Sequence, residues 1–453
     1  MNIKKNNKTI FFPIEIKTRE LLPKLYLVNK SLNEGFNCFI GDKIGINRAL
    51  NYFSPGTYFY KSINVFDNLR IKKIISKGNH YVALDEEGGF AFEKNSDLKN
   101  FINLRSSYEN VKIIDLFFNW GKFDFQAYRN IYKEFKQKFI LTGGPKINLW
   151  TKKFVKKIYN KEIEYIKQKY GEDFIFITGS SWSNKSEALK SFRLSTRSYK
   201  FKKNNEKKKR IELLFKEVKD FKTFGKMIKY IIQKNPNKKF IIRPHPAESI
   251  RDWEKVLNNK KNNNFSIIKK FDATPWVYLA SQLIHNKSSV VLEAVMLKKK
   301  IISFRSRITS RDFVNKFGYI AKNKIQVNKY LSKKFSSFTI SKKMRRELNY
   351  KLLNSNNKEN ACNNILKNIK KIHKRENSYS IFKIYLFSLM FSIYDNFNYF
   401  FGFKKLNSSL KKTLDDKLKG GIKKKEIVNT LNKFKKNDYK VIRISSNSYF
   451  VSI

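Results

Sequence analysis

Phe240-Ile-Ile-Arg-Pro-His-Pro-Ala-Glu248 is the stretch of this chain that decides its fold. The β-branched and aromatic run at its start predicts a strand that ends at Arg243, because Pro244 and Pro246 cannot donate to a sheet and fix φ on both sides of His245. In an open α/β sheet, ligands bind in the crevice beyond the carboxyl ends of the strands. Arg243 and His245 are therefore expected in such a crevice, where a guanidinium and an imidazole both suit a phosphate.

A second stretch, Leu283-Ile-His-Asn-Lys-Ser-Ser-Val-Val-Leu-Glu293-Ala, predicts a different kind of anion site. A short apolar strand turns into a helical run, and Ser288 and Ser289 fall where the N-cap of that helix is expected. Hydroxyls and free N–H groups at a helix N-terminus favour a phosphate oxygen. Glu293 has no lysine three or four residues ahead of it and could accept ribose hydroxyls. Each stretch alone has a purely structural explanation, a helix cap or a proline turn, but together they favour a nucleotide site.

Length, hydrophobic content and net charge limit the classes of protein to which this chain can belong. With 453 residues, 41% of them hydrophobic, the chain can bury two cores and carry an appendage. The formal charge of +59 is spread from end to end among the lysines, so we interpret most of it as compositional bias and the rest as an aid to binding anionic lipid, nucleotide or polyanionic acceptors. The usual nucleic-acid modules are not visible, and nucleic acid is not an expected partner.

Cysteine usage and hydropathy indicate a cytoplasmic protein. Cys38 and Cys362 offer neither a disulfide framework nor a metal site, which fits a reducing compartment. The apolar run near the N-terminus is interrupted by Pro13 and Glu15, too soon for a secretory signal. The apolar stretch Ile384 to Tyr394 is shorter than the roughly 20 residues of a spanning helix, so no transmembrane helix is expected.

Strand-like and helical runs alternate twice along the chain. The first series, in residues 1–150, predicts strands at Thr9–Ile16, Phe36–Ile40, Thr57–Tyr60, Tyr81–Asp85, Lys112–Phe118 and Lys138–Thr142. After a long lysine-rich helix, about Leu149 to Tyr170, the second series, within residues 151–335, predicts strands at Phe174–Thr178, Phe240–Arg243, Ser266–Lys269, Gln282–His285 and Lys300–Phe304. Residues 336–453 predict a basic helical appendage that ends in a hairpin, Tyr439–Ser445 and Tyr449–Ile453.

The expected fold class is therefore α/β, with two Rossmann-like doubly wound domains facing a cleft and a helical, basic C-terminal appendage. This is the GT-B architecture of glycosyltransferases. The same arrangement also serves sugar-nucleotide epimerases and polyol-phosphate transferases.

Several motifs carry a resemblance to a known family. They are Pro13-Ile-Glu-Ile-Lys-Thr-Arg-Glu-Leu21, Asp85-Glu-Glu-Gly88, Thr142-Gly-Gly-Pro145, Arg243-Pro-His-Pro246 with Trp253, and His285-Asn-Lys-Ser-Ser-Val-Val-Leu-Glu-Ala294. From about Pro13 to Ser303 the chain resembles the bacterial surface carbohydrate biosynthesis proteins, which are similar to capsular Kdo transferases and teichoic-acid polymerases. The resemblance implies a GT-B glycosyltransferase of lipopolysaccharide or capsule assembly.

Two loops depart from the family pattern. Gly144-Pro-Lys-Ile-Asn148 lacks an Arg and an Asp that the family carries there, which puts a phosphate or acceptor role for this loop in doubt. Thr178-Gly-Ser-Ser-Trp182 stands where related chains have an Asn-rich loop. Ser180 and Ser181 could still cradle a donor phosphate through their hydroxyl and N–H groups.

Glycosyl transfer needs a phosphate cradle and a carboxylate that activates the acceptor hydroxyl. We predict the cradle at Arg243, His245, Ser288, Ser289 and Glu293. Because no Asp-x-Asp pair stands at a strand end, cationic side chains and a helix N-terminus are expected to stabilise the leaving group. The nucleotide sugar would be a substrate, and neither a cofactor nor a divalent metal is expected.

The predicted acceptor-side carboxylate is Glu15 or Glu20, since both flank the carboxyl end of the first strand. Asp85 and Glu86 are the next candidates. Glu15 could instead be an outward strand residue, and Glu20 a first-turn acid that complements the helix dipole. Arg19 could pair with a carboxylate or a phosphate.

An aromatic segment, Ile381 to Phe403, lies between basic clusters at Lys370–Arg375 and Lys404–Lys412. This pattern suits an interfacial helix on an acidic membrane surface, where a lipid-linked acceptor would be found. It equally suits a helix that packs on the protein core or in a dimer interface.

The predicted function is that of a cytoplasmic, peripherally membrane-associated transferase moving a sugar from a nucleotide donor to a surface-glycan precursor. Two alternatives remain open. One is a CDP-alditol polyol-phosphate transferase of the teichoic-acid type, with His245 as base; the other is a non-catalytic basic binding protein on the same fold.

Overall fold

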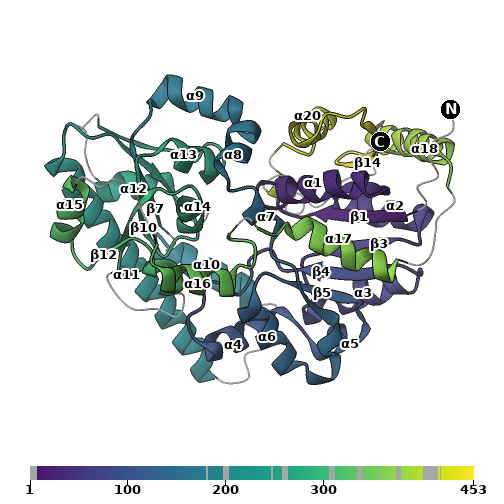
Figure 1. The fold of residues 1–453 in the computed structure, drawn as a ribbon, viewed down its shortest axis with the longest axis horizontal. Coiled ribbons are helices and arrows are strands. Elements are labelled where there is room, and N and C mark those ends of the chain that lie inside the picture. The colour runs from purple at the N-terminus through teal and green to yellow at the C-terminus, as the bar shows by residue number, and fades with distance from the viewer. Residues whose placement is uncertain are drawn as a thin grey trace. The chain divides into compact units, whose positions relative to one another are not determined.

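A computed structural model describes residues 8–179, 182–196, 204–245, 248–257, 264–305, 312–333, 340–356, 358–373, 379–400, 417–418 and 420–453. The chain divides into two compact units. Figure 1 colours the ribbon by residue number, from purple at the N-terminus to yellow at the C-terminus. Unit 1 comprises Met1–Phe90, Lys94–Leu149 and Arg346–Ile453, and unit 2 comprises Ala91–Glu93 and Trp150–Arg345.

Unit 1 is built on a sheet with the strand order β13-β14-β2-β1-β3-β4-β5-β6. The strands β1 to β6 pair in parallel, as the alternation of runs predicts. Phe11 and Phe12, neighbours on β1, are both fully buried, because helices cover both faces of a parallel sheet. The strands are β1 Lys8–Ile14, β2 Phe36–Asp42, β3 Thr57–Tyr60, β4 His80–Leu84, β5 Leu116–Asn119, β6 Phe139–Leu141, β13 Lys440–Ser445 and β14 Ser448–Ser452.

The helices of unit 1 connect these strands or follow them at the C-terminus (Figure 1). They are α1 Lys17–Asn33, α2 Lys43–Phe53, α3 Asn68–Ile75, α4 Asn95–Arg105, α5 Tyr108–Ile113, α6 Lys122–Ile131, α7 Pro145–Asn148, α17 Ala361–Ile372, α18 Ile381–Phe400 and α20 Lys424–Phe434, with short 3-10 turns at Val65–Asp67 and Lys133–Lys138. A further helix, α16 Lys342–Lys351, leads from the sequence of unit 2 into that of unit 1.

The C-terminal hairpin forms as the sequence predicts, and it also extends the sheet. β14 pairs antiparallel with β2, placing Tyr449 opposite Ile40 and Phe450 opposite Phe39. The close approach needs Gly41, since a Cβ there would stand 2.3 Å from the Cα of Ser448. The hairpin thus covers the edge that β2 would otherwise expose.

Residues from Arg346 onward belong to unit 1, whereas the sequence treats 336–453 as a separate part. Asn354 shows how this segment is held: its amide donates to the carbonyl of Gly144 (3.1 Å) and to Oδ1 of Asn148 (2.8 Å). Asn148 in turn accepts from the N–H of Ala361 at 3.0 Å. The loop that departs from the family pattern therefore anchors the C-terminal segment.

Unit 2 is built on a sheet with the strand order β12-β11-β10-β7-β8-β9, all pairs parallel. The strands are β7 Ile175–Gly179, β8 Phe240–Arg243, β9 Phe265–Ile267, β10 Gln282–Asn286, β11 Lys300–Phe304 and β12 Tyr319–Ala321, of which β12 was not predicted. The helices are α8 Lys152–Ile158, α9 Asn160–Tyr170, α10 Lys185–Thr196, α11 Asn204–Lys234, α12 Ile250–Leu257, α13 Ala273–Leu279, α14 Val291–Met296 and α15 Lys324–Ser332, with a 3-10 turn at Asp312–Lys316.

Two predicted elements are wrong in detail. The expected strand Lys112–Phe118 is a helix up to Ile113 and a strand only from Leu116, because Ser107 caps α5 by accepting the N–H of Asn110. The expected single helix from Leu149 to Tyr170 is broken, since Thr151 caps the start of α8 and Tyr159 has non-helical dihedrals between α8 and α9.

The two strand orders locate the ligand-binding edge of each unit. In unit 1 the order reverses between β1 and β3, and in unit 2 between β7 and β10. Ligands bind beyond the carboxyl ends of the strands at such switch points. The residues that follow β1 and β3, and those that end β7 and β10, are therefore the places to look for a site.

Candidate functional site

Glu15 and Lys61 meet at the switch point of unit 1. The Lys61 ammonium lies 3.1 Å from Oε2 of Glu15, and Lys417 lies 2.9 Å from Oε1. Burial opposes ionisation of Glu15, but Lys61 and Lys417 outweigh it and hold the pKa of this carboxyl well below its usual range. Glu15 is thus a permanently charged ion-pair partner at neutral pH.

Glu20 is fully buried and uses both carboxylate oxygens within the protein. One oxygen accepts from Lys24 (3.0 Å) and from the N–H of Glu15 (3.1 Å). The other accepts from Lys61 (2.9 Å) and from the N–H of Ile16 (3.1 Å). Although burial raises it, Lys24 and Lys61 lower the pKa of Glu20 to about 2. This carboxylate fixes the start of α1 and has no lone pair left for a proton in transfer.

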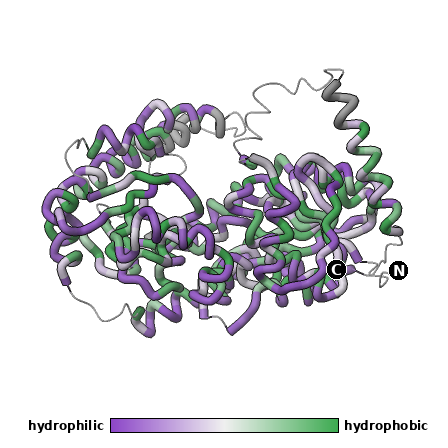
Figure 2. Tube along the Cα trace, turned by 90° about the horizontal axis from the view of Figure 1, so that it is seen from above, coloured by the Kyte–Doolittle hydropathy of each residue, from purple (hydrophilic) through white to green (hydrophobic). Residues whose placement is uncertain are grey.

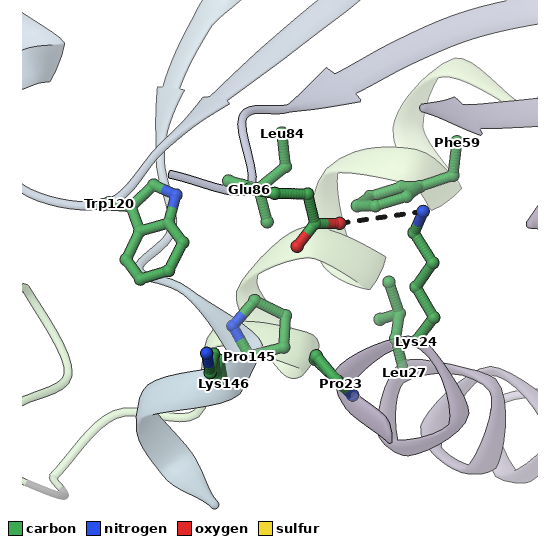
Figure 3. A pocket seen from close by; sticks show the side chains of 9 residues that line it. All are labelled: Pro23, Lys24, Leu27, Phe59, Leu84, Glu86, Trp120, Pro145 and Lys146. Carbon is green, nitrogen blue, oxygen red and sulfur yellow. Dashed lines mark ion pairs between the residues drawn. The ribbon is translucent and has the colours of Figure 1, made fainter. Parts of the chain in front are cut away.

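Glu86 stands in different surroundings from Glu15 and Glu20. It follows β4 and lines a small pocket of unit 1, with a cavity volume of about 20 Å³, that is partly open to solvent (Figure 3). The Lys24 ammonium lies 3.6 Å from its Oε1, and 12% of its side chain is exposed. Burial raises the pKa of Glu86 from 4.5 to about 7, against the pull of Lys24. The pocket is lined by Pro23, Lys24, Leu27, Phe59, Leu84, Glu86, Trp120, Pro145 and Lys146.

Asp85 and Arg19, also predicted on this side, are held in ion pairs. Asp85 forms a fork with Arg105, with both N–O distances at 2.7 Å, and accepts the N–H of Glu87 at 2.8 Å. Arg19 donates to Glu87 at 3.2 Å. These contacts shape the loop that carries Glu86.

A cationic cluster, which sequence reasoning missed, adjoins Glu15. Lys43 lies 5.5 Å from the ring centroid of Tyr60, and the guanidinium carbon of Arg70 lies 4.7 Å from it. Burial, together with Arg70, lowers the pKa of Lys43 to about 8. With Lys61 and Lys417, this gives the edge a positive field suited to an anionic ligand. In a chain so rich in lysine, no local signal marks these particular residues.

In unit 2, Arg243 ends β8 and His245 follows it, as predicted. Arg243 donates from Nη2 to the carbonyl of Phe271 at 3.0 Å, while its buried Nε has no hydrogen-bond partner among the described residues. Burial lowers the pKa of Arg243, and the nearby carboxylates of Asp272 and Glu293 partly oppose this shift. Burial, with Arg243 and Lys269 nearby, lowers the pKa of His245 to about 4, so its imidazole is neutral at pH 7.

The loop after β8 is held by Glu248, which is 2% exposed. Its Oε2 accepts from the N–H of His245 and from the indole N–H of Trp253, both at 2.9 Å. Trp253 is fully buried and stacks edge-on against Phe221, with 4.9 Å between ring centroids. The position of His245 is therefore tied to the core of unit 2.

The second predicted anion site differs from expectation. α14 has only six residues, and its N-cap is Val290, with no side-chain cap. Ser288 makes only a long contact with the Val290 N–H, at 3.4 Å, and Ser289 is exposed. The serines do not cap this helix because the turn closes through their carbonyls: Ser288 accepts from the N–H of Val291 and Ser289 from the N–H of Leu292. Ser180 and Ser181 lie outside the described residues.

Glu293 is buried and accepts from the hydroxyl of Thr274 at 2.7 Å. This bond occupies one lone pair of Oε2. A contact of Glu293 with a ribose stays a prediction.

Asn286 is the residue that sequence reasoning overlooked in unit 2. It ends β10, opposite Gly179 of β7, and so stands at the switch point. The side chain is 1% exposed, and neither its amide nitrogen nor its oxygen has a hydrogen-bond partner in the described part of the chain. Buried polar atoms are almost always paired, so this amide is an available donor and acceptor for a ligand. The only sequence signal was its place at a strand end.

Two of the four described non-glycine residues with positive φ lie at this edge, whereas Asp173 and Lys298 precede β7 and β11. Phe271 and Lys287, which follow β9 and β10, have φ values of 62° and 56° without being glycine. Such conformations cost energy and gather at functional sites. Among the described residues, no group of three or more His, Cys, Asp or Glu could hold a metal ion.

No protein-family model matches the chain, and no curated protein matches it in sequence. Solved structures do match its fold. A UDP-N-acetylglucosamine 2-epimerase has a TM-score of 0.50 and 11% identity, over 83% of this chain and 99% of its own. The S. aureus MnaA–UDP co-structure has a TM-score of 0.48 and 12% identity, over 82% and 100%. The wall teichoic acid polymerase TagF has a TM-score of 0.47 and 13% identity, over 82% and 90%. At such identities the likeness shows the fold alone, which is the predicted pair of Rossmann-like units of the GT-B type with a helical C-terminal region.

Proposed function

We propose that this protein is a nucleotide-sugar-dependent glycosyltransferase that acts on a lipopolysaccharide, capsule or other surface-glycan precursor. One observation carries the proposal: Glu86, in a pocket of unit 1, has its pKa raised to about 7. A general base works best when its pKa lies near the working pH. Glu86 therefore replaces Glu15 and Glu20 as the expected acceptor-side base, since both of those are held ionised by lysines.

Unit 2 binds the donor in this proposal. Arg243 and His245 contact the diphosphate, and the amide of Asn286 supplies a donor and an acceptor to the nucleotide. Glu293 accepts a ribose hydroxyl beside its bond to Thr274. The fold neighbour with a TM-score of 0.50 is named for a UDP-sugar, which supports this donor class.

The transfer step then needs no redox partner. Glu86 takes the proton of an acceptor hydroxyl, whose oxygen forms a bond to the anomeric carbon of the donor. The bond between that carbon and the phosphate oxygen breaks, and the nucleotide leaves with the electron pair. Arg243 neutralises the charge that develops on the phosphate. The cationic edge with Lys43, Lys61 and Arg70 favours an acceptor that carries phosphate or carboxylate groups.

The second candidate is a nucleotide-sugar epimerase, favoured by the name of the fold neighbour that covers 83% of this chain. An epimerase converts its sugar nucleotide without an acceptor, whereas a transferase needs one. Incubation of the protein with each sugar nucleotide alone, followed by NMR of the sugar, separates the two. A CDP-alditol polyol-phosphate transferase with His245 as base would instead turn over CDP-alditols, and a non-catalytic binding protein would turn over none of these donors.

The first test is a thermal-shift screen against CMP, CDP, UDP, GDP and their sugars, with the wild type, His245→Ala and Lys255→Ala. Lys255 is exposed on α12 of the same unit, so its variant controls for loss of a surface cation. We expect one nucleotide class to raise the Tm of the wild type and the control but not of His245→Ala. If no nucleotide shifts the Tm of the folded wild type, the transferase proposal fails in favour of the binding protein.

A further inference from the structure

α18 exposes an unusual amount of apolar surface. Seven large side chains of this helix are 45% to 72% exposed, and green segments run along its described part in Figure 2. They recur at intervals of three and four residues and so form one continuous stripe. These residues are Phe382, Tyr385, Leu386, Leu389, Met390, Ile393 and Tyr394.

The opposite face of α18 packs against the rest of unit 1, so the exposed stripe cannot rotate into the protein interior. Ile384 is 1% exposed and Phe387 is 8% exposed. The ring of Phe387 packs against Phe53 and Tyr52 of α2, at 5.3 and 4.8 Å between centroids. The hydroxyl of Ser388 donates to a carbonyl of β13. The apolar stripe is therefore a fixed outer surface of unit 1.

Cations border this stripe. Arg48 lies over the rings of Phe391 and Tyr394, at 5.0 and 5.7 Å. Lys440 lies 5.5 Å from the ring of Tyr385. Lys383 donates to the carbonyl of Tyr52, and no acidic residue occurs between 381 and 394. An apolar stripe with basic borders matches the interface of an anionic bilayer, where apolar side chains reach the acyl region and cations meet the headgroups.

We propose that α18 lies in the interface of an anionic membrane and holds unit 1 on it, independently of the function proposed above. A second copy of the chain is the less suitable occupant, because it would bring together two surfaces bordered by cations in a protein of formal charge +59. Within the described residues, no helix is long and apolar enough to cross a membrane.

The test is co-sedimentation of the full chain with vesicles of phosphatidylglycerol and phosphatidylcholine or of phosphatidylcholine alone. The variant is Leu389→Glu with Ile393→Glu. Its matched control is Leu69→Glu with Ile325→Glu, because these leucine and isoleucine side chains are 82% and 65% exposed on α3 and α15. A thermal melt of each variant checks that it is folded.

We expect the wild type and the control to bind the anionic vesicles at least tenfold more tightly than the α18 variant, and the affinity to fall with added salt. Lack of binding by the wild type, or equal binding by the α18 variant, would overturn the proposal. So would a wild-type dimer in light scattering without vesicles that the α18 variant abolishes, because the stripe would then be a contact between two copies.

Discussion

The Lys24 ammonium lies 3.6 Å from the Glu86 carboxylate, and the same ammonium lies 3.0 Å from Glu20. One lysine thus borders two carboxyls with opposite properties. At Glu86 the effect of burial exceeds that of Lys24 and raises the pKa of this carboxyl to about 7. At Glu20, Lys61 is a second cation beside Lys24, and together they lower the pKa to about 2. Because of this difference in pKa, we expect Glu86 to transfer the proton and Glu20 to have a structural role.

Glu86→Gln should lower kcat by about 10²- to 10⁴-fold, the usual contribution of a general base. The wild-type rate should rise with pH through about 7, because the base acts only when deprotonated, and the variant should lose this dependence. Glu109→Gln, an exposed carboxylate on α5 of the same unit, is the control and should keep the profile. A pH–rate curve that is unchanged in Glu86→Gln would exclude Glu86 as the base.

Glu20→Gln should destabilise unit 1 by about 3–5 kcal/mol, because it leaves buried lysines without their partner. The pKa of Glu20 is lower in the folded protein than its ordinary value of 4.5, so its contribution is present above pH 4.5 and is lost as pH falls toward 2. Urea unfolding of the wild type and the variant at pH 7 and pH 3 measures this. The gap between their free energies of unfolding should narrow at pH 3; a constant gap would mean that packing, not charge, is responsible.

Asn286→Leu should weaken nucleotide binding by about 10- to 100-fold, the effect of leaving ligand groups unpaired. Its apo Tm should not fall, because the amide makes no hydrogen bond within the described residues. Gln282→Leu is the matched control: its buried Oε1 also lacks a hydrogen-bond partner among the described residues, but it lies at the opposite end of β10. Calorimetric titration with the nucleotide found in the screen should show the loss for Asn286→Leu alone. Equal losses in both variants would point to a general effect on β10.

Chelation with EDTA should leave sugar transfer within twofold of the untreated rate. Arg243 supplies the positive charge that a divalent ion provides in other transferases. Rates are compared before and after EDTA, and again with excess Mg²⁺. Loss of activity that Mg²⁺ restores would show that the cradle is incomplete without a metal.

The sequence predicts the strands well where the runs are short, apolar and bounded by proline or polar residues. Phe240–Arg243 and Lys300–Phe304 have their predicted bounds, and the terminal hairpin forms where expected. Lys112–Ile113 was assigned to a strand because its β-branched residues outweighed the local cap at Ser107. The serines before α14 were misread since capping depends on dihedrals that composition does not reveal.

The amino-acid sequence alone predicts the two doubly wound parallel sheets and the place of Arg243 and His245 at a strand end, because hydrophobic periodicity and proline act locally. The folded arrangement alone shows which carboxyl has a pKa near neutral pH, that a lysine 402 positions away helps to keep Glu15 ionised, and that the buried Asn286 amide has no hydrogen-bond partner among the described residues. The physical reason is that a pKa and an unmet hydrogen bond depend on burial and on charges from distant parts of the chain, which come together only when the chain folds.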